Sequence, residues 1–289
     1  MSSPSAITTT YSPATATATI TLDIPRKLNA LTARHYHQLA SAMHEVAARD
    51  DIYITVLTGK GRFFSAGADV GAIGGEGDGQ GKGKEDTGAK EADERVKWLK
   101  GFVAGNLHIT HAFYTHPKIL ITALNGPAVG LSAALIAMSD FIYSAPHAYL
   151  LTPFSSLGLV SEGAACISLV RRLGLAKANE ALIMGKKITC AELLQTGFVN
   201  KVFEGAGDER SEGFSERFLG LVMEEVGERL GGLNGESLVG IKGLIQGPWR
   251  GVMDRANMDE VMGGLGRFIK GVPQEEFRRM ARGEKKHKL

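Results

Sequence analysis

The segment from Leu124 to Leu135, LNGPAVGLSAAL, constrains the fold of this chain more than any other part of the sequence. An apolar run at 119–124 leads into it, an apolar helical run follows, and the turn between them carries no charge. Turns that only reverse the chain are usually polar and exposed. We therefore expect a buried strand, turn and helix whose small residues let another molecule approach the backbone.

Strands and helices alternate along most of the chain, which predicts an α/β core over 1–205 and a helical region over 206–289. A helix is expected over 32–49 with Thr32 as its N-cap. Strands are expected at 16–24, 52–57, 119–124, 141–144, 148–151 and 199–203, and further helices near 132–139, 163–173, 176–184, 189–195, 212–230, 236–246, 250–270 and 274–283.

Composition narrows the functional classes. Of the 289 residues, 44% are hydrophobic and 22% are charged, as in ordinary globular proteins. The net charge of +2 gives no reason to expect a nucleic-acid partner. No apolar run approaches the roughly 20 residues that a membrane span needs. Two cysteines, Cys166 and Cys190, are too few for a disulfide framework, so we interpret them as buried small side chains.

Residues 71–90, GAIGGEGDGQGKGKEDTGAK, differ in composition from the rest of the chain. They are mostly glycine and charged residues, which bury too little apolar area to become ordered. They contain neither of the common glycine-rich phosphate-binding sequences. We therefore predict a flexible surface insertion here.

A second turn of small residues, GKGRFFSAGAD at 59–69, also follows a predicted buried strand. Two such turns, each presenting one backbone N–H, could converge on a single oxygen atom, which is the geometry of an oxyanion hole. The helix that begins near Leu131 would add the positive end of its dipole. The alternative is that both segments are ordinary strand-to-helix connections.

The two turns together resemble those of the crotonase (enoyl-CoA hydratase/isomerase) superfamily, through FSAGAD at 64–69, LNGPAVGLSAAL at 124–135 and SDFIYSAP at 139–146. The similarity extends over about 16–205 and is weaker in the C-terminal helices. It implies a spiral of ββα units with a helical C-terminal region that completes the site and forms homotrimers, sometimes paired into hexamers. It also implies that the N–H groups of Ala68 and Leu131 are the oxyanion donors.

The resemblance also implies where coenzyme A (CoA) binds. The segment IPRKLNAL at 24–31 is similar to the family segment that lies against CoA. The residues expected to contact substrate or CoA are Lys27, Leu28, Ala30, Ala66, Gly67, Asp69, Val70 and Gly130. Lys27 and Lys270 are candidates for the CoA phosphates, the alternative being solvated surface charges. The family needs no metal or organic cofactor, because CoA is part of the substrate, and the i, i+3 pair His108 and His111 is not interpreted as a metal site.

The acid–base residues point to one subgroup. Hydratases of the family carry glutamates at the positions of Ala134 and Phe154, and neither of these side chains can carry a proton. LGLVSEGAA at 157–165 instead resembles the segment with the catalytic glutamate of fungal and mammalian peroxisomal Δ3,Δ2-enoyl-CoA isomerases, which implies that Glu162 is the base. The alternative is a helix-start carboxylate after a Ser161 cap. Asn106, which those isomerases also carry, would hold a water or the glutamate, or simply satisfy a neighbour.

The resulting hypothesis is isomerisation of 3-enoyl-CoA to trans-2-enoyl-CoA, with Glu162 moving a proton from C2 to C4. Apolar surroundings, namely Leu159, Val160 and Ala164, are expected to raise the pKa of this carboxyl. Two alternatives remain open. One is another acyl-CoA enzyme of the superfamily, such as a hydratase or a secondary-metabolite enzyme, and the other is a non-catalytic acyl-CoA-binding protein.

The final tripeptide, His287-Lys288-Leu289, is a variant of the Ser-Lys-Leu type of peroxisomal address. Together with the resemblance, it predicts a peroxisomal import receptor as a partner and the peroxisomal matrix as the location. The alternative is an ordinary basic tail after a final helix.

Overall fold

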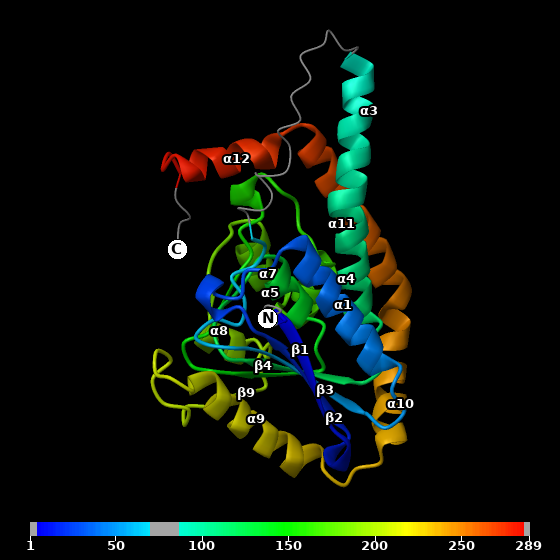
Figure 1. Cartoon of the computed structure of the whole chain (residues 1–289), viewed down its shortest axis with the longest axis vertical. Coiled ribbons are helices and arrows are strands. Elements are labelled where there is room, and N and C mark those ends of the chain that lie inside the picture. The colour runs from blue at the N-terminus through cyan, green and yellow to red at the C-terminus, as the bar shows by residue number, and fades with distance from the viewer. Residues whose placement is uncertain (1–4, 70–86, 286–289) are drawn as a thin grey trace.

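The structure is a computed structural model that describes residues 5–69 and 87–285. Its centre is a six-stranded sheet of order β1-β2-β3-β4-β6-β9, in which only β1 is antiparallel to its neighbour (Figure 1). The strands are β1 (Ile7–Ser12), β2 (Thr17–Leu22), β3 (Ile54–Gly59), β4 (Ile119–Leu124), β6 (Phe141–Ser144) and β9 (Lys201–Val202). A second, three-stranded sheet joins β5 (Ala128–Val129), β7 (Tyr149–Leu151) and β8 (Ile188–Thr189).

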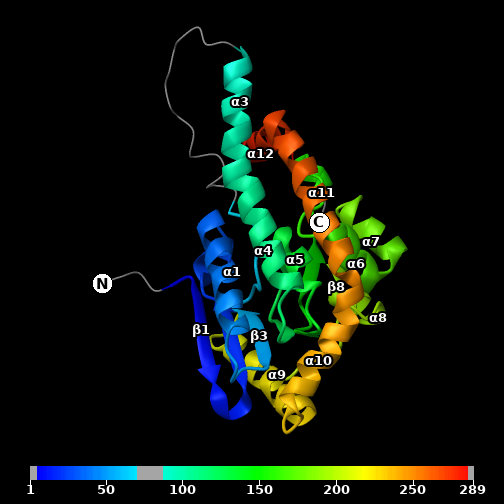
Figure 2. The same cartoon turned by 90° about the vertical axis from the view of Figure 1, so that its right-hand side faces the viewer.

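Helices surround both sheets. They are α1 (Ala33–Ala47), α3 (Thr87–Trp98), α4 (Ala104–Tyr114), α5 (Leu131–Ile136), α6 (Ala165–Leu173), α7 (Leu175–Leu182), α8 (Cys190–Gln195), α9 (Phe214–Leu230), α10 (Gly235–Gln246), α11 (Arg250–Ile269) and α12 (Val272–Ala281). A π-helical turn, η3 (Leu99–Val103), joins α3 to α4, so that the three form one long rod beyond the sheet (Figure 1). α11 packs along this rod and also contacts α6 (Figure 2).

Every residue of the neighbouring strands β3 and β4 is buried, as expected for parallel strands covered on both faces. One face packs under α9, where Val56 and Ile121 meet Phe218. The opposite face packs under α1 and α4, where Leu57 joins the cluster that contains Met43. Because β3 and β4 are parallel and in register, the turns that follow them leave the sheet at the same edge.

Most of the predicted elements are present, and Thr32 is the N-cap of α1: its Oγ1 accepts a hydrogen bond from the His35 N–H at 3.3 Å. Strand β1 was not predicted. The predicted insertion at 71–90 is wrong at its end, because Thr87 already begins α3; residues 70–86 lie outside the described residues. Within the described ranges, no helix is long and apolar enough to cross a membrane.

Candidate active site

The two turns of small residues lie directly beside each other. The Ser65 N–H donates to the carbonyl of Pro127 at 3.1 Å, and the Val129 N–H donates to the carbonyl of Ser65 at 2.9 Å. The segment after β3 therefore runs parallel to β5, which lies within the turn after β4. Residues that are some sixty positions apart in the sequence thus form one surface, as the oxyanion-hole hypothesis requires.

Buried asparagine side chains hold the turn that follows β3, at residues 59–69. Asn125 accepts from the Gly59 N–H at 3.0 Å and donates to the carbonyls of Gly61 and Phe63 at 2.6 and 3.1 Å. Asn29 donates to the Phe63 carbonyl from the other side at 2.8 Å. Both amides are fully buried. A neutral amide satisfies several backbone groups at once without burying a charge, so these buried contacts need no ionised side chain.

Glycine is required at the point where the turns touch. Gly67 has φ +87°, and a Cβ on it would lie 2.8 Å from the Val129 carbonyl oxygen and 3.8 Å from the Gly130 nitrogen. Gly130 also has a positive φ, of +61°. These values are accessible to glycine at little cost and strain other residues.

The amides of Ala68 and Leu131 follow these two glycines. The Asp69 N–H donates to the Leu31 carbonyl and the Gly130 N–H donates to the Leu151 carbonyl, so the flanking amides are occupied. By contrast, neither Ala68 N–H nor Leu131 N–H donates to any residue that the structure describes. Leu131 opens α5, and the first N–H groups of a helix have no partner within it. Two backbone donors on touching turns are thus available to a ligand.

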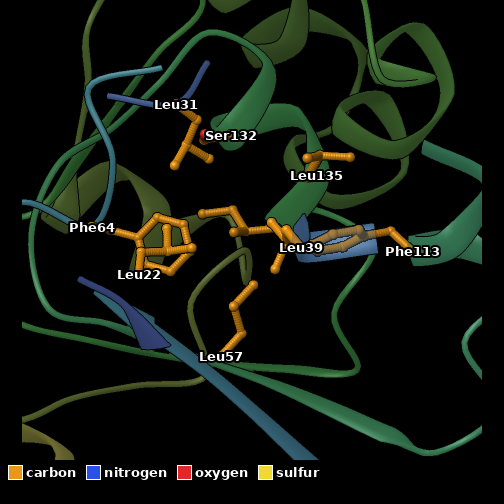
Figure 3. A pocket seen from close by; sticks show the side chains of 9 residues that line it. Leu22, Leu31, Leu39, Leu57, Phe64, Phe113, Ser132 and Leu135 are labelled. Atoms are coloured by element: carbon orange, nitrogen blue, oxygen red, sulfur yellow. The ribbon is translucent and has the colours of Figure 1, made fainter. Parts of the chain in front are cut away.

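Buried hydroxyl groups connect α5 to the turn at residues 59–69. The Ser65 hydroxyl lies 2.9 Å from that of Ser132, and the Tyr36 hydroxyl lies 3.3 Å from Ser132 on the other side. Below them, Figure 3 shows a pocket lined by leucine, isoleucine and phenylalanine side chains in which Ser132 is the only polar lining residue. Apolar packing and this hydroxyl chain together fix the start of α5 relative to Gly67.

Glu162 is buried, with 8% of its surface exposed, and is held by Asn106. The Nδ2 of Asn106 donates to Oε2 of Glu162 at 2.7 Å. The Thr110 hydroxyl donates to Oδ1 of the same amide at 3.4 Å, which orients Asn106 so that its NH2 group faces the carboxylate. Asn106 therefore binds the glutamate, which is one of the roles predicted for it.

The backbone around Glu162 places it against α5. The interpretation as a helix-start carboxylate capped by Ser161 is wrong, because α6 begins only at Ala165 and Ala164 is its N-cap. Gly163 has φ +74°, and a Cβ on it would lie 2.9 Å from both Leu131 Cδ1 and Ala134 Cβ. The turn that carries Glu162 therefore packs on the first turn of α5, beside the second backbone donor.

Burial raises the pKa of Glu162 to about 7; the hydrogen bond from Asn106 opposes this shift, and the nearby carboxylate of Glu260 adds to it. Ala164 is buried and Leu159 half-buried, as expected, but Val160 is exposed and shields the carboxyl less than predicted. No lysine or arginine within the described ranges forms an ion pair with Glu162. Near neutral pH this carboxyl can therefore both accept and return a proton.

Most of the residues expected to contact CoA lie in or beside the turn at residues 59–69. The Ala66 N–H donates to the Leu28 carbonyl at 2.9 Å, and Lys27 forms an ion pair with Asp69 at 2.8 Å. Ala30 lies on the same segment, one residue before the Leu31 bridge to Ala68. Lys270 is exposed at the end of α11, and Val70 lies outside the described residues.

The histidine and cysteine side chains named in the sequence analysis take no part in the chemistry of the site. The His108 ring packs against His37 and His44, with ring centroids 5.4 and 5.3 Å apart. Cys190 is buried as predicted, whereas Cys166 is only half-buried. Burial and Glu260 raise the pKa of Cys166 to about 12, so its thiol is a poor nucleophile.

Sequence reasoning missed Glu260, a buried carboxylate on α11 whose Oε1 accepts from the Cys166 N–H at 2.9 Å. Glu260 lies three residues after another buried polar side chain, Asn257, and the burial of both is set by the packing of α11 rather than by a motif in the sequence.

Comparison with known proteins gives a consistent result. The enoyl-CoA hydratase/isomerase family model matches residues 13–208. A Delta(3,5)-Delta(2,4)-dienoyl-CoA isomerase of Pyricularia oryzae is 54% identical over 276 residues, 94% of this chain and 95% of that protein. A 3,2-trans-enoyl-CoA isomerase of Saccharomyces cerevisiae is 36% identical over 266 residues, 92% of this chain and 91% of that one.

Among solved structures, an enoyl-CoA hydratase/isomerase from Pseudoalteromonas atlantica superposes with a TM-score of 0.79 at 20% identity, covering 99% of this chain and all of that one. At this identity the likeness concerns the fold alone. It confirms the crotonase-type fold that the two turns predicted.

Proposed function

Since the chain belongs to the enoyl-CoA hydratase/isomerase family, we propose that it is an enoyl-CoA isomerase that converts 3-enoyl-CoA, cis or trans, into trans-2-enoyl-CoA during β-oxidation of unsaturated fatty acids. Relatives that are named isomerases and match nearly the whole chain support the reaction type. The Δ3,Δ2 specificity is our inference from the site.

The observation that carries the proposal is the buried carboxylate of Glu162, which Asn106 holds at 2.7 Å and which lies on a turn packed against the first turn of α5. Hydration of a double bond must activate a water molecule. The positions where hydratases of the family carry glutamates hold the buried apolar side chains of Ala134 and Phe154. One base beside two backbone donors suits a proton transfer within the substrate better than addition of water.

The chemistry follows from where charge develops. The thioester carbonyl oxygen would accept hydrogen bonds from the N–H groups of Ala68 and Leu131, which stabilise the enolate formed when Glu162 removes a proton from C2. Losing one such donor typically raises the barrier by about 3–4 kcal/mol. Glu162 then returns the proton to C4, and the double bond moves into conjugation with the carbonyl. C2 and C4 are two bonds apart, so one carboxylate reaches both.

A second candidate reaction is conversion of 3,5-dienoyl-CoA into 2,4-dienoyl-CoA, because the relative with 54% identity carries that name. Here the proton moves from C2 to C6, four bonds away. This longer transfer asks more of a single carboxylate, which is why we place it second.

The test compares the purified protein with its Glu162→Gln variant on 3-hexenoyl-CoA and on a 3,5-dienoyl-CoA, following the absorbance of the conjugated thioester. We expect turnover of 3-hexenoyl-CoA that the substitution abolishes. Faster turnover of the dienoyl substrate would favour the second candidate. Robust turnover by the variant, or hydration of 2-enoyl-CoA faster than isomerisation, would contradict the proposal.

Assembly and location remain proposals as well. Large apolar side chains are exposed along α10, with Leu244 at 81% and Ile241 and Ile245 above half, which supports a homotrimer or hexamer formed through the C-terminal helices. Light scattering of the protein and of the Leu244→Asp variant measures the mass of the assembly.

The tripeptide His287-Lys288-Leu289 lies outside the described residues. Imaging a fluorescent fusion with and without this tripeptide tests whether the protein enters the peroxisomal matrix. We propose no metal or separate cofactor.

A further inference from the structure

Helix α11 carries two buried polar side chains on one face. Asn257 and Glu260 are 2% and 5% exposed and are three residues apart, a spacing that puts them side by side on a helix. Each contacts the backbone of a different element. The Nδ2 of Asn257 donates to the Leu107 carbonyl on α4 at 3.3 Å, and Oε1 of Glu260 accepts from the Cys166 N–H on α6 at 2.9 Å.

These two backbone groups belong to the segments that carry the acid–base pair. Leu107 directly follows Asn106, and Cys166 lies in the first turn of α6, four residues after Glu162. Figure 2 shows α11 running past both α4 and α6. One face of α11 thus bridges the two elements whose separation determines the bond between Asn106 and Glu162.

Burying the carboxylate of Glu260 costs more free energy than a purely structural contact requires. A buried carboxylate loses its hydration, and Oε2 of Glu260 is buried with no hydrogen-bond partner among the described residues. No lysine or arginine in the described part of the chain forms an ion pair with it. A neutral side chain could accept the same hydrogen bond from Cys166 at lower cost, so the charge itself calls for a reason.

The presence of Glu162 accounts for the charged side chain at position 260. The side chains that act on the carboxyl of Glu162 are Asn106 on α4 and the Glu260 carboxylate on α11, and Glu162 in turn raises the pKa of the Tyr36 hydroxyl on α1. Asn106 lowers the pKa of Glu162, whereas Glu260, like burial, raises it. A carboxylate with a higher pKa is a better proton acceptor.

We propose that Glu260 is a positioning residue for the isomerisation: through the Cys166 N–H it fixes the segment that carries Glu162, and its carboxylate forms part of the electrostatic surroundings of that residue. This inference rests on the proposed function, in which Glu162 is the catalytic base.

Two substitutions separate the two effects. Glu260→Gln keeps an oxygen that can accept from Cys166 but removes the charge. We expect its kcat at about pH 8 to fall roughly 3-fold, and the acidic limb of its kcat/KM profile to move to lower pH, because Glu162 becomes a weaker base. Glu260→Ala also removes the hydrogen bond. We expect it to lose more than about tenfold in kcat, since misplacement of a catalytic group is costly, and to show faster amide hydrogen exchange at Cys166.

The control is Glu225→Gln, which removes an equally buried carboxylate that lies on α9, and its pH profile should match that of the natural protein. If Glu260→Gln gives the same acidic limb as the natural protein while Glu162→Gln is inactive, the inference is wrong and the proposed function stands. If Glu162→Gln remains active, the proposed function itself fails. Should Glu260→Ala not fold, the Glu260→Gln profile alone still decides.

Discussion

Two glutamates with the same exposure, 8%, occupy opposite electrostatic environments in this protein. Glu225 on α9 forms ion pairs with Lys201 and Arg229. These hydrogen bonds, that of Lys201 foremost, hold its pKa below the usual range. Among the described residues, the hydrogen-bond partner of the Glu162 side chain is the neutral amide of Asn106, and burial raises the pKa of Glu162 to about 7.

The difference teaches that burial alone does not decide how a carboxyl behaves. Around Glu225, hydrogen bonds from cations outweigh desolvation and lower the pKa, so the carboxylate stays ionised near neutral pH. Around Glu162 no described cation pairs with the carboxyl, desolvation dominates and raises the pKa to about 7, and the group can exchange protons near neutral pH. The candidate site has backbone amides as its donors and an asparagine as its orienting group, and both leave the basicity of Glu162 largely intact.

The largest expected effect separates the two glutamates directly. Glu162→Gln should lower kcat on 3-hexenoyl-CoA by about 10³–10⁴-fold, at the upper end of what one acid–base group contributes. Glu225→Gln should leave kcat within about 2-fold, because its carboxylate is not basic. Steady-state kinetics on both variants measures this. A comparable loss in Glu225→Gln would end the contrast between the two sites.

The next effect leaves both carboxylates in place. Gly67→Ala forces a Cβ to within 2.8 Å of the Val129 oxygen and displaces the Ala68 amide. We expect kcat to fall by about 10²–10³-fold, as for the loss of one oxyanion donor. Gly174→Ala is the matched control, because Gly174 also has a positive φ, +76°, but a Cβ there meets nothing within 4 Å. Equal losses in the two variants would mean that backbone strain, and not the donor, is responsible.

Stability should depend on pH with opposite signs at the two glutamates. The folded pKa of Glu162 is raised from 4.5 to about 7, so its contribution to stability falls as pH rises through this interval and stays constant above it. Glu162→Gln should therefore be more stable than the natural protein at about pH 8, by at most about 3 kcal/mol, with the gain vanishing in acid.

The folded pKa of Glu225 is lowered, so its ion pairs add stability above its unfolded pKa and lose it as pH falls through the folded value. Glu225→Gln should thus be less stable near neutral pH and converge with the natural protein in acid. Urea unfolding at several pH values measures both variants. The same pH trend in the two would contradict the assignment of their environments.

The smallest expected effect concerns the orienting amide. Asn106→Ala removes the hydrogen bond that lowers the pKa of Glu162, so the acidic limb of kcat/KM should move to higher pH, and kcat should fall by about tenfold as the carboxyl loses its orientation. The control, Thr110→Val, removes only the 3.4 Å bond to Asn106 and should show a weaker form of the same change. An acidic limb that moves to lower pH instead would mean that Asn106 does not stabilise the ionised form.

The sequence could predict those parts of the fold that depend on local pattern. Both small-residue turns, the fully buried strands β3 and β4 and the Thr32 cap follow from composition and spacing. Strand β1 was not predicted because ITTTYS is an edge strand in which only Ile7 of the six residues is buried, and its pairing with β2 supplies the order that its composition lacks. Helix α3 was not predicted because it begins within a glycine-rich, charged stretch and packs against α11, which is distant in the sequence.

The sequence by itself determined which residues are able to do chemistry: two glycine-containing turns, one glutamate after them and an asparagine before that glutamate. Only the tertiary structure decided that Asn106 meets Glu162 across 56 positions and that Glu260 reaches Cys166 across 94. The physical reason is that a pKa depends on desolvation and on charges close in space. Both are set by packing between distant elements, which local residue patterns do not encode.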